Sequence, residues 1–242
     1  MIRSGRLAAL PGIRHGLTTR DDGSVGPHSD PDARARRARS AVLLGCAAAR
    51  LVAPHQVHGA RVAVVDGRHA GCAPLPETDG LATTERGLVL LVQGADCPLL
   101  LLADADAPAL AVVHSGWRGT VAGIAGVAVE ALVTLGARRE RLVAALFPGI
   151  APCCFEVSDD VRDAFRESHG HAADAWFAAG ARPGKWQLDL HAAIAATLAA
   201  AGVSAERQDR VPGCTACSGT LWSHRASRGG PERHGLFAAL TS

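Results

Sequence analysis

The sequence predicts a single mixed α/β domain covering residues 1–242. Aliphatic runs without polar alternation, at 88–92, 99–102 and 109–113, are typical of strands buried on both faces. Segments with apolar residues three or four positions apart, bounded by capping residues and glycines, indicate helices. Hydrophobic residues make up 48% of the chain, which is enough for a sizeable core, and no repeat or low-complexity linker divides it.

The N-terminal half should begin with short strands and turns, because residues 1–30 are rich in Gly, Pro, Asp and Ser. A helix is expected over 32–44, with Asp32 as its cap and Gly45 at its end. The strands expected in this half are 62–65, 88–92, 99–102 and 109–113.

The C-terminal half should alternate between helices and strands. A helix is expected between Gly119 and Gly136, where apolar residues share one face. Ser158 and the two aspartates that follow it predict a second helix start, and an alanine-rich helix is expected over 188–201. The strands expected in this half are 142–147, 221–225 and 235–240.

Charge and segment lengths exclude several classes of protein. A net charge of +2 is too balanced for a nucleic-acid-binding surface. The N-terminus has no long apolar stretch typical of a signal peptide, and no apolar run is long enough to span a membrane. We therefore expect a cytoplasmic monomer. Its seven cysteines, an odd number in a reducing compartment, should not form a disulfide framework.

His58, Cys97 and His114 each lie at the edge of an apolar run. One thiolate and two imidazoles suit a borderline metal such as zinc, and three protein ligands would leave a fourth position open for water or substrate. Each residue also has an ordinary structural interpretation, since a lone cysteine is usually a small core residue. Asp96 could act as a base, as a partner of an imidazole, or as a turn carboxylate, and Asp79 fits turn chemistry.

The remaining cysteine motifs have weaker interpretations. Cys214 and Cys217 form a single C-x-x-C, which needs a second pair to indicate structural zinc. Cys153 and Cys154 are adjacent and too close to make an ordinary chelate alone. We interpret the segment 214–219 as a loop, because a redox motif would sit at a helix start after a strand.

Six blocks, in order along the chain, resemble the laccase-domain family, which is also described as purine nucleoside phosphorylase and peptidoglycan editing factor. The blocks are Gln56-Val57-His58-Gly59, Thr78-Asp79-Gly80-Leu81, Ala95-Asp96-Cys97-Pro98, Val113 to Gly119, Gly149 to Val157 and Leu188-Asp189-Leu190. The C-terminal block departs from the family pattern, because Ser223-His224-Arg225 stands where Tyr-Arg-Arg is usual.

The resemblance implies a layered α/β/β/α domain of mixed sheets and a zinc ion held by His58, Cys97 and His114. It also implies phosphorolysis of adenosine, inosine, guanosine and methylthioadenosine, deamination of adenosine, and a role in editing cell-wall precursors. For these reactions we expect Asp96 to move a proton. The expected contacts to nucleoside or phosphate are Gln56, Arg118, Arg225 and Arg20.

Three other functions compete with this one. Cys97 paired with His114 could be the nucleophile of a hydrolase that edits peptidoglycan precursors. A polyphenol oxidase of the multicopper type needs several paired His-x-His motifs plus a His-Cys-His run, a set that this chain lacks, so copper is a poorer candidate than zinc. A non-catalytic metal-binding protein would complete the ligand shell with His55 or Cys72.

Overall fold

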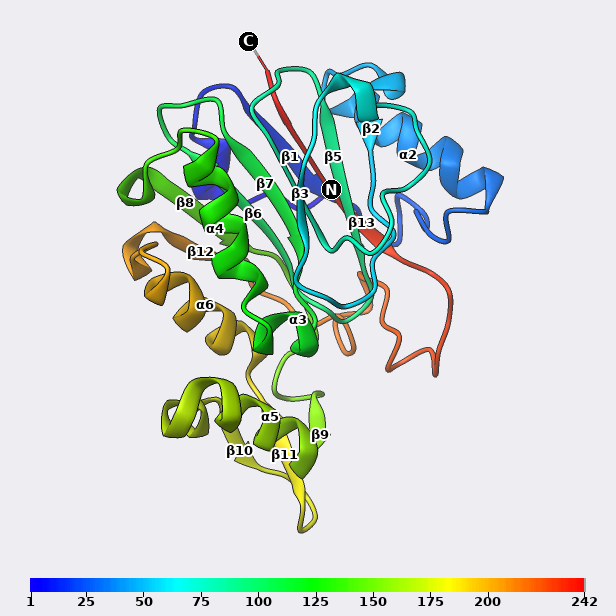
Figure 1. Ribbon diagram of the computed structural model, residues 1–242. Helices are drawn as coiled ribbons and strands as arrows, with labels where there is room; N and C mark the ends of the chain where they lie inside the picture. The colour runs from blue at the N-terminus through cyan, green and yellow to red at the C-terminus, as the bar shows by residue number, and fades with distance from the viewer. Residues whose placement is uncertain (242) are drawn as a thin grey trace.

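The computed structural model describes residues 1–241, and these form α/β/β/α layers (Figure 1). Two sheets pack face to face, and helices cover their outer faces. A small third sheet with its own helix lies at one end of the molecule. The mixed, layered fold class is therefore confirmed.

The larger sheet has the strand order β12-β8-β6-β7-β4-β3 over the described residues. Its strands are β3 (Val62–Val64), β4 (Gly80–Thr83), β6 (Leu99–Asp104), β7 (Leu110–His114), β8 (Leu142–Leu146) and β12 (Gln208–Arg210). The central strands pair antiparallel, whereas β12 and β3 add parallel at the edges. The register pairs Leu99 with His114, so the loop before β6 lies beside the end of β7.

The second sheet has the order β1-β13-β5-β2. Its strands are β1 (Ile13–Leu17), β2 (Leu51–Val52), β5 (Val89–Gly94) and β13 (His234–Leu240). β13 pairs antiparallel with both β1 and β5, so strands from the two ends of the chain lie side by side. This pairing places the segment before β13 next to the end of β5.

Three of the helices cover the outer faces of the sheet pair. The described residues form α1 (Gly5–Ala8), α2 (Pro31–Leu43), α3 (Trp117–Val121), α4 (Ile124–Thr134), α5 (Asp159–His169) and α6 (Leu190–Ala200). α2 packs on the smaller sheet, while α4 and α6 pack on the larger one. The small sheet consists of β9 (Glu156–Ser158), β10 (Phe177–Ala179) and β11 (Lys185–Leu188), and α5 packs against it.

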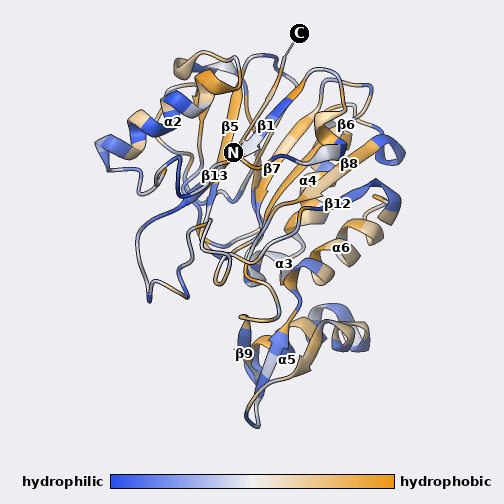
Figure 2. Cartoon of the chain, turned by 180° about the vertical axis from the view of Figure 1, so that it is seen from behind, coloured by the Kyte–Doolittle hydropathy of each residue, from blue (hydrophilic) through white to orange (hydrophobic). Residues whose placement is uncertain are grey.

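Alternate residues of each central strand face different layers. Leu90 of β5 and Leu101 of β6 pack between the sheets, whereas Leu91 faces α2 and Leu100 faces α4 and α6. Each such side chain is fully buried, and burial of one leucine contributes about 2 kcal/mol. Strands buried on both faces must be apolar throughout, and Figure 2 shows the central strands coloured as hydrophobic while α2 carries hydrophilic stretches.

The structure corrects two expected helix boundaries. The helix expected between Gly119 and Gly136 is two helices, because Gly123 adopts a left-handed φ of 78° and interrupts it. Asp30, rather than Asp32, caps α2: its carboxylate accepts the Asp32 backbone N–H, and Pro31 occupies the first helical position.

Other differences arise where tertiary contacts override local pattern. The segment 221–225 is a loop rather than a strand, and its Ser223 hydroxyl donates to Asp96. Ser158 precedes α5 without a capping hydrogen bond, because its hydroxyl donates to Asp160. β4 and the small sheet were not predicted, since their runs are short and lack a clear period. Within residues 1–241, none of the helices combines the length and apolar character needed to cross a membrane.

Candidate active site

Two loops and the end of a strand bring together His58, Cys97 and His114 at one edge of the sheets. Cys97 lies between β5 and β6, His114 is the last residue of β7, and His58 lies in the loop between β2 and β3. The ligand atoms of the three side chains all lie within 4.8 Å of one another. The structure therefore brings together the three residues that the sequence proposed as a metal-binding set.

The backbone at this edge allows the side chains of His58 and Cys97 to lie close together. His58 and Asp96 both adopt positive φ, 62° and 89°, which costs energy for residues with a side chain and is common at functional sites. A Cβ on Gly116 would stand 3.0 Å from the Cys97 sulfur and 3.1 Å from Cδ2 of His58. A larger residue at Gly116 would therefore push the two side chains apart.

Asp79 supports the site through hydrogen bonds to His114 and to the loop that carries His58. In the sequence analysis Asp79 was interpreted as a turn residue, and this role was missed. Its buried carboxylate accepts the Nδ1–H of His114 at 2.9 Å. It also accepts the backbone N–H groups of Val57, His58 and Gly59 at 2.8–3.1 Å. A carboxylate that fixes one nitrogen of an imidazole leaves Nε2 free to bind a metal and sets the ring orientation.

Interactions among His58, Cys97, His114 and Asp79 shift the pKa values of Cys97 and His114. Burial raises the pKa of the Cys97 thiol, but His114 and His58 outweigh burial and lower it to about 6. Burial lowers the pKa of His114, but the Cys97 thiolate and the Asp79 carboxylate outweigh it and raise the pKa to about 9. The pair is therefore poised as thiolate and imidazolium at neutral pH, and a cation would replace the imidazole proton.

This donor set fits zinc. A thiolate and two imidazoles are typical zinc ligands, and the Asp79–His114 contact supplies the supporting carboxylate that such sites use. Within residues 1–241, neither His55 nor Cys72 joins the group. The arrangement therefore offers three protein ligands and leaves room for a fourth ligand from solution, as in catalytic sites.

A cavity of about 420 Å³ opens directly onto these ligands. That volume lies in the range of small-molecule sites. Two aromatic side chains, Trp117 and Phe155, form part of the wall. The cavity also reaches residues that the sequence did not single out as contacts, among them His28, Gln93, Ile150, Leu190, His224 and Arg233.

Two of the predicted substrate contacts, Gln56 and Arg118, line this cavity, and they differ in how firmly other protein groups hold their side chains. Gln56 is held by Gln93, because its Nε2 donates to the Gln93 carbonyl at 2.7 Å and its Oε1 accepts the Gln93 N–H at 2.8 Å. Arg118 is exposed and stacks 4.3 Å from the Trp117 ring. Among the described residues, Arg118 has no carboxylate partner. Its guanidinium is therefore available to an anion.

The other two predicted arginines differ in position. Arg225 lines the cavity, and its side chain donates to the carbonyls of Cys154 and Glu156 at 3.4 and 3.3 Å. Arg20 donates to the Leu221 carbonyl and lies 4.8 Å from the Trp222 ring. Arg20 is not among the described residues that line the cavity.

Asp96 lines the cavity while holding the C-terminal loop in place. Its carboxylate accepts from Thr215 and Ser223 at 2.7 and 2.6 Å and from the Arg225 backbone N–H at 2.7 Å. A carboxylate has about four acceptor positions, so about one remains for a proton in transit. The roles proposed for Asp96 from sequence, as a base, as a partner of an imidazole or as a turn carboxylate, remain predictions, and the carboxylate that contacts His114 is Asp79.

The structure adds a second group of possible ligands that sequence reasoning treated as separate motifs. Cys153, Cys154, Cys214 and Cys217 have their sulfurs within 4.8 Å of one another. The signal that could have found this group is the presence of two close cysteine pairs in one chain.

The chain also holds one His-x-His pair of the kind that copper oxidases use, His169 and His171. His169 stacks on Phe165, and His171 is fully exposed.

The chain resembles known proteins over most of its length. It is 40% identical over 229 residues to the purine nucleoside phosphorylase SCO2081 of Streptomyces coelicolor, covering 93% of this chain and 88% of that one. It is 40% identical over 186 residues to the adenosine deaminase RL5 of an unknown prokaryotic organism, covering 74% and 71%. The crystal structure of YlmD from Geobacillus stearothermophilus superposes with a TM-score of 0.91 at 29% identity, covering 100% and 98%.

A family model described as multi-copper polyphenol oxidoreductase laccase matches residues 18–241. That range contains the three candidate ligands, Asp79 and most of both sheets. The chain therefore belongs to the family of the multi-copper polyphenol oxidoreductase laccase model.

Proposed function

We propose that the chain is a zinc-dependent purine nucleoside phosphorylase that also deaminates adenosine. The observation that carries the proposal is the convergence of His58, Cys97 and His114 at a cavity of about 420 Å³. The names of the relatives, purine nucleoside phosphorylase and adenosine deaminase, support this choice over other reactions at such a site. The substrates are adenosine, inosine, guanosine and methylthioadenosine.

His58, Cys97 and His114 would hold the zinc ion, which acts as a Lewis acid and lowers the pKa of bound water toward neutrality. Asp79 keeps the His114 ring in one orientation through its 2.9 Å hydrogen bond. The same carboxylate holds the backbone of the loop that carries His58. These contacts preorganise the site before substrate enters.

The cavity wall supplies the substrate contacts. The aromatic side chains of Trp117 and Phe155 line the cavity and give it an apolar wall that suits a purine base. Phosphorolysis needs phosphate at C1′ of the ribose while the bond to the base breaks and the base gains a proton. Arg118 is the best-placed cation for phosphate, because Arg225 already donates to two carbonyls. Asp96, with an acceptor position to spare, is the candidate for moving the proton.

The test is product analysis by chromatography with each nucleoside, with and without phosphate. Phosphorolysis should give the free base and ribose 1-phosphate, or 5-methylthioribose 1-phosphate from methylthioadenosine, only when phosphate is present. Deamination should give inosine from adenosine without phosphate. The Cys97→Ser variant should lose both reactions, and the exposed-thiol variant Cys72→Ser should keep them. Zinc-loaded protein that consumes none of the nucleosides under either condition would refute the proposal.

A second candidate, an amide-cleaving hydrolase that acts on cell-wall precursors, is favoured by the lowered pKa of Cys97 beside His114. In that reaction the Cys97 thiolate would attack the amide carbonyl, and His114 would protonate the leaving amine. Mass spectrometry of metal-free protein incubated with amide substrates separates the two proposals. A covalent acyl adduct on Cys97 supports the hydrolase, whereas unmodified Cys97 with intact nucleoside turnover in the zinc-loaded protein excludes it.

A further inference from the structure

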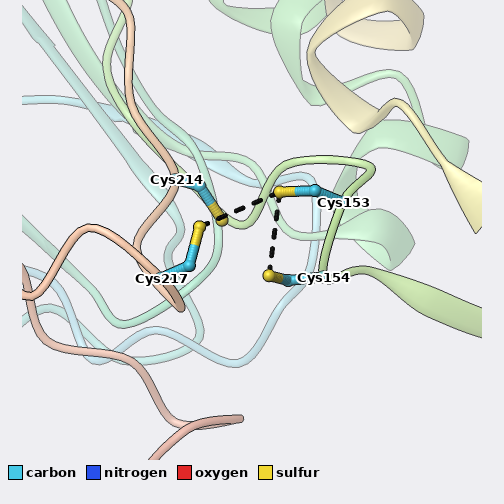
Figure 3. Close-up of side chains that lie close together, drawn as sticks. All are labelled: Cys153, Cys154, Cys214 and Cys217. Atoms are coloured by element: carbon cyan, nitrogen blue, oxygen red, sulfur yellow. Dashed lines mark hydrogen bonds between the residues drawn. The ribbon is translucent and has the colours of Figure 1, made fainter.

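A cluster of four cysteines lies outside the candidate active site, and nothing in the proposed reaction uses it. Cys153 and Cys154 occupy the turn between β8 and β9, and Cys214 and Cys217 occupy the loop after β12. Figure 3 shows the four side chains converging from these two segments, which are about sixty residues apart in sequence. All four sulfur atoms lie within 4.8 Å of one another.

The sulfur separations match a single tetrahedral ion. Four sulfurs bound to one zinc ion at the usual distance of about 2.3 Å stand about 3.8 Å apart from one another. In the structure the sulfur of Cys153 lies 3.7 Å from that of Cys154 and 3.9 Å from that of Cys217. A disulfide would require a separation of about 2.05 Å, and an iron–sulfur cluster would hold the sulfurs further apart because several atoms lie between them.

The surrounding backbone holds the two segments in register. Gly149 and Cys214 form a parallel bridge, and the Thr215 N–H donates to the Gly149 carbonyl at 3.0 Å. The Ala151 N–H points at the Cys214 sulfur at 3.4 Å. A backbone N–H directed at a sulfur favours the thiolate that a metal requires.

Hydrophobic packing does not explain the cluster. Cys153 and Cys217 are exposed, whereas cysteines that serve as small apolar residues are usually buried. The adjacent pair 153–154 cannot chelate well alone, but the C-x-x-C pair supplies the second half of a four-thiolate set. Four cysteine ligands with no imidazole are typical of structural zinc.

We propose that Cys153, Cys154, Cys214 and Cys217 form a second zinc site, closed and structural, distinct from the centre at His58, Cys97 and His114. Binding replaces the thiol protons, which pass to the buffer, and involves no oxidation. The site connects two segments: the turn just before Phe155 and the loop that precedes Arg225. Both Phe155 and Arg225 line the cavity. Its role is to hold the two cavity walls together, and it does not depend on nucleoside turnover.

The first test counts zinc in protein purified under reducing conditions. The native chain should hold two zinc ions, Cys97→Ser should hold one, and Cys217→Ser should hold one. Cys72→Ser is the matched control, since Cys72 is an exposed thiol outside both groups, and it should hold two. One zinc ion in the native chain together with none in Cys97→Ser, even after titration with zinc, would overturn the proposal.

The second test needs no change within the cluster, so it remains decisive if Cys217→Ser fails to fold. Cobalt(II) is added to Cys97→Ser, which keeps six of the seven cysteines. Intense thiolate charge-transfer bands with tetrahedral ligand-field bands are expected, and zinc should protect four thiols from a thiol reagent. Absence of these bands, or six thiols that react equally with and without zinc, would show that the cluster binds neither ion.

Discussion

The two groups of candidate metal ligands in this chain differ in donor set, location and support. The group at His58, Cys97 and His114 has three ligands at strand ends, a carboxylate behind one imidazole, and a cavity in front. The four-cysteine cluster has four thiol donors in two loops, and none of the described residues places a carboxylate in a hydrogen bond to them. Zinc sites with an open position serve catalysis, whereas sites closed by four protein ligands serve structure. On this contrast we propose that the first group serves chemistry and the second serves stability.

The largest expected effect is the loss of turnover in Cys97→Ser. Removal of the thiolate removes the metal, and with it several kcal/mol of transition-state stabilisation, so kcat/KM should fall by roughly 1000-fold. Steady-state kinetics with inosine and phosphate provide the measurement, and Cys72→Ser provides the control. A decrease of less than about tenfold would remove the contrast between the two groups, because neither would then be catalytic.

The next effect is on stability and belongs to the cluster. Loss of a bound ion in Cys217→Ser should lower the free energy of unfolding by about 3 kcal/mol, or the melting temperature by about 6–12 °C. Thermal melts of zinc-loaded proteins measure it, with Cys72→Ser again as the control. At a temperature where Cys217→Ser is folded, its turnover should fall far less than that of Cys97→Ser. An unchanged melting temperature would argue against a structural role.

A smaller effect is expected at the carboxylate that supports His114. Asp79→Asn keeps the size of the side chain but weakens its hold on the Nδ1–H of His114, so zinc affinity or turnover should fall by about 10- to 100-fold. Competition with a chromogenic chelator measures the affinity. Asp66→Asn is the matched control, because Asp66 also contacts a histidine, His69, but on the surface. Equal effects of the two changes would show that Asp79 has no special role.

The smallest effect concerns thiol reactivity in metal-free protein at different pH values. The pKa of Cys97 is lowered to about 6 because His114 and His58 outweigh burial, whereas burial and its cysteine neighbours raise the pKa of Cys154 to about 12. Since the thiolate is the reactive form, alkylation of Cys97 should be rapid at pH 7 and fall about tenfold per pH unit below pH 6. Peptide mapping after iodoacetamide treatment measures both sites. Faster labelling of Cys154 than of Cys97 at pH 7 would contradict the assignment.

Much of the fold could be predicted from local pattern. The runs around Leu90, Leu101 and Val112 are apolar at every position because both faces of each strand are buried, and this is visible in sequence. The small sheet could not be predicted, because three-residue strands are stabilised by their partners and carry little pattern of their own. The break at Gly123 was missed because apolar spacing continues across it.

The candidate ligands His58, Cys97 and His114 could be proposed from sequence because each ends an apolar run and lies within a recognisable block. Asp79 could not be ranked, since an Asp-Gly pair fits a turn as well as a ligand support. The cysteine pairs 153–154 and 214–217 each lack a full ligand set, so neither pair alone indicates a metal site. Their meeting depends on the parallel bridge between Gly149 and Cys214, a contact that no local pattern encodes.

The class of fold, the apolar strands and the residue types available for chemistry can be inferred from the sequence, because burial and helix or strand periodicity leave local patterns in it. Which of those residues meet depends on the packing of the whole chain. Loops that are distant in sequence lie together when strand register and sheet packing place them there, and those forces act across the whole chain. The carboxylate behind His114 and the four neighbouring sulfurs are both products of that packing.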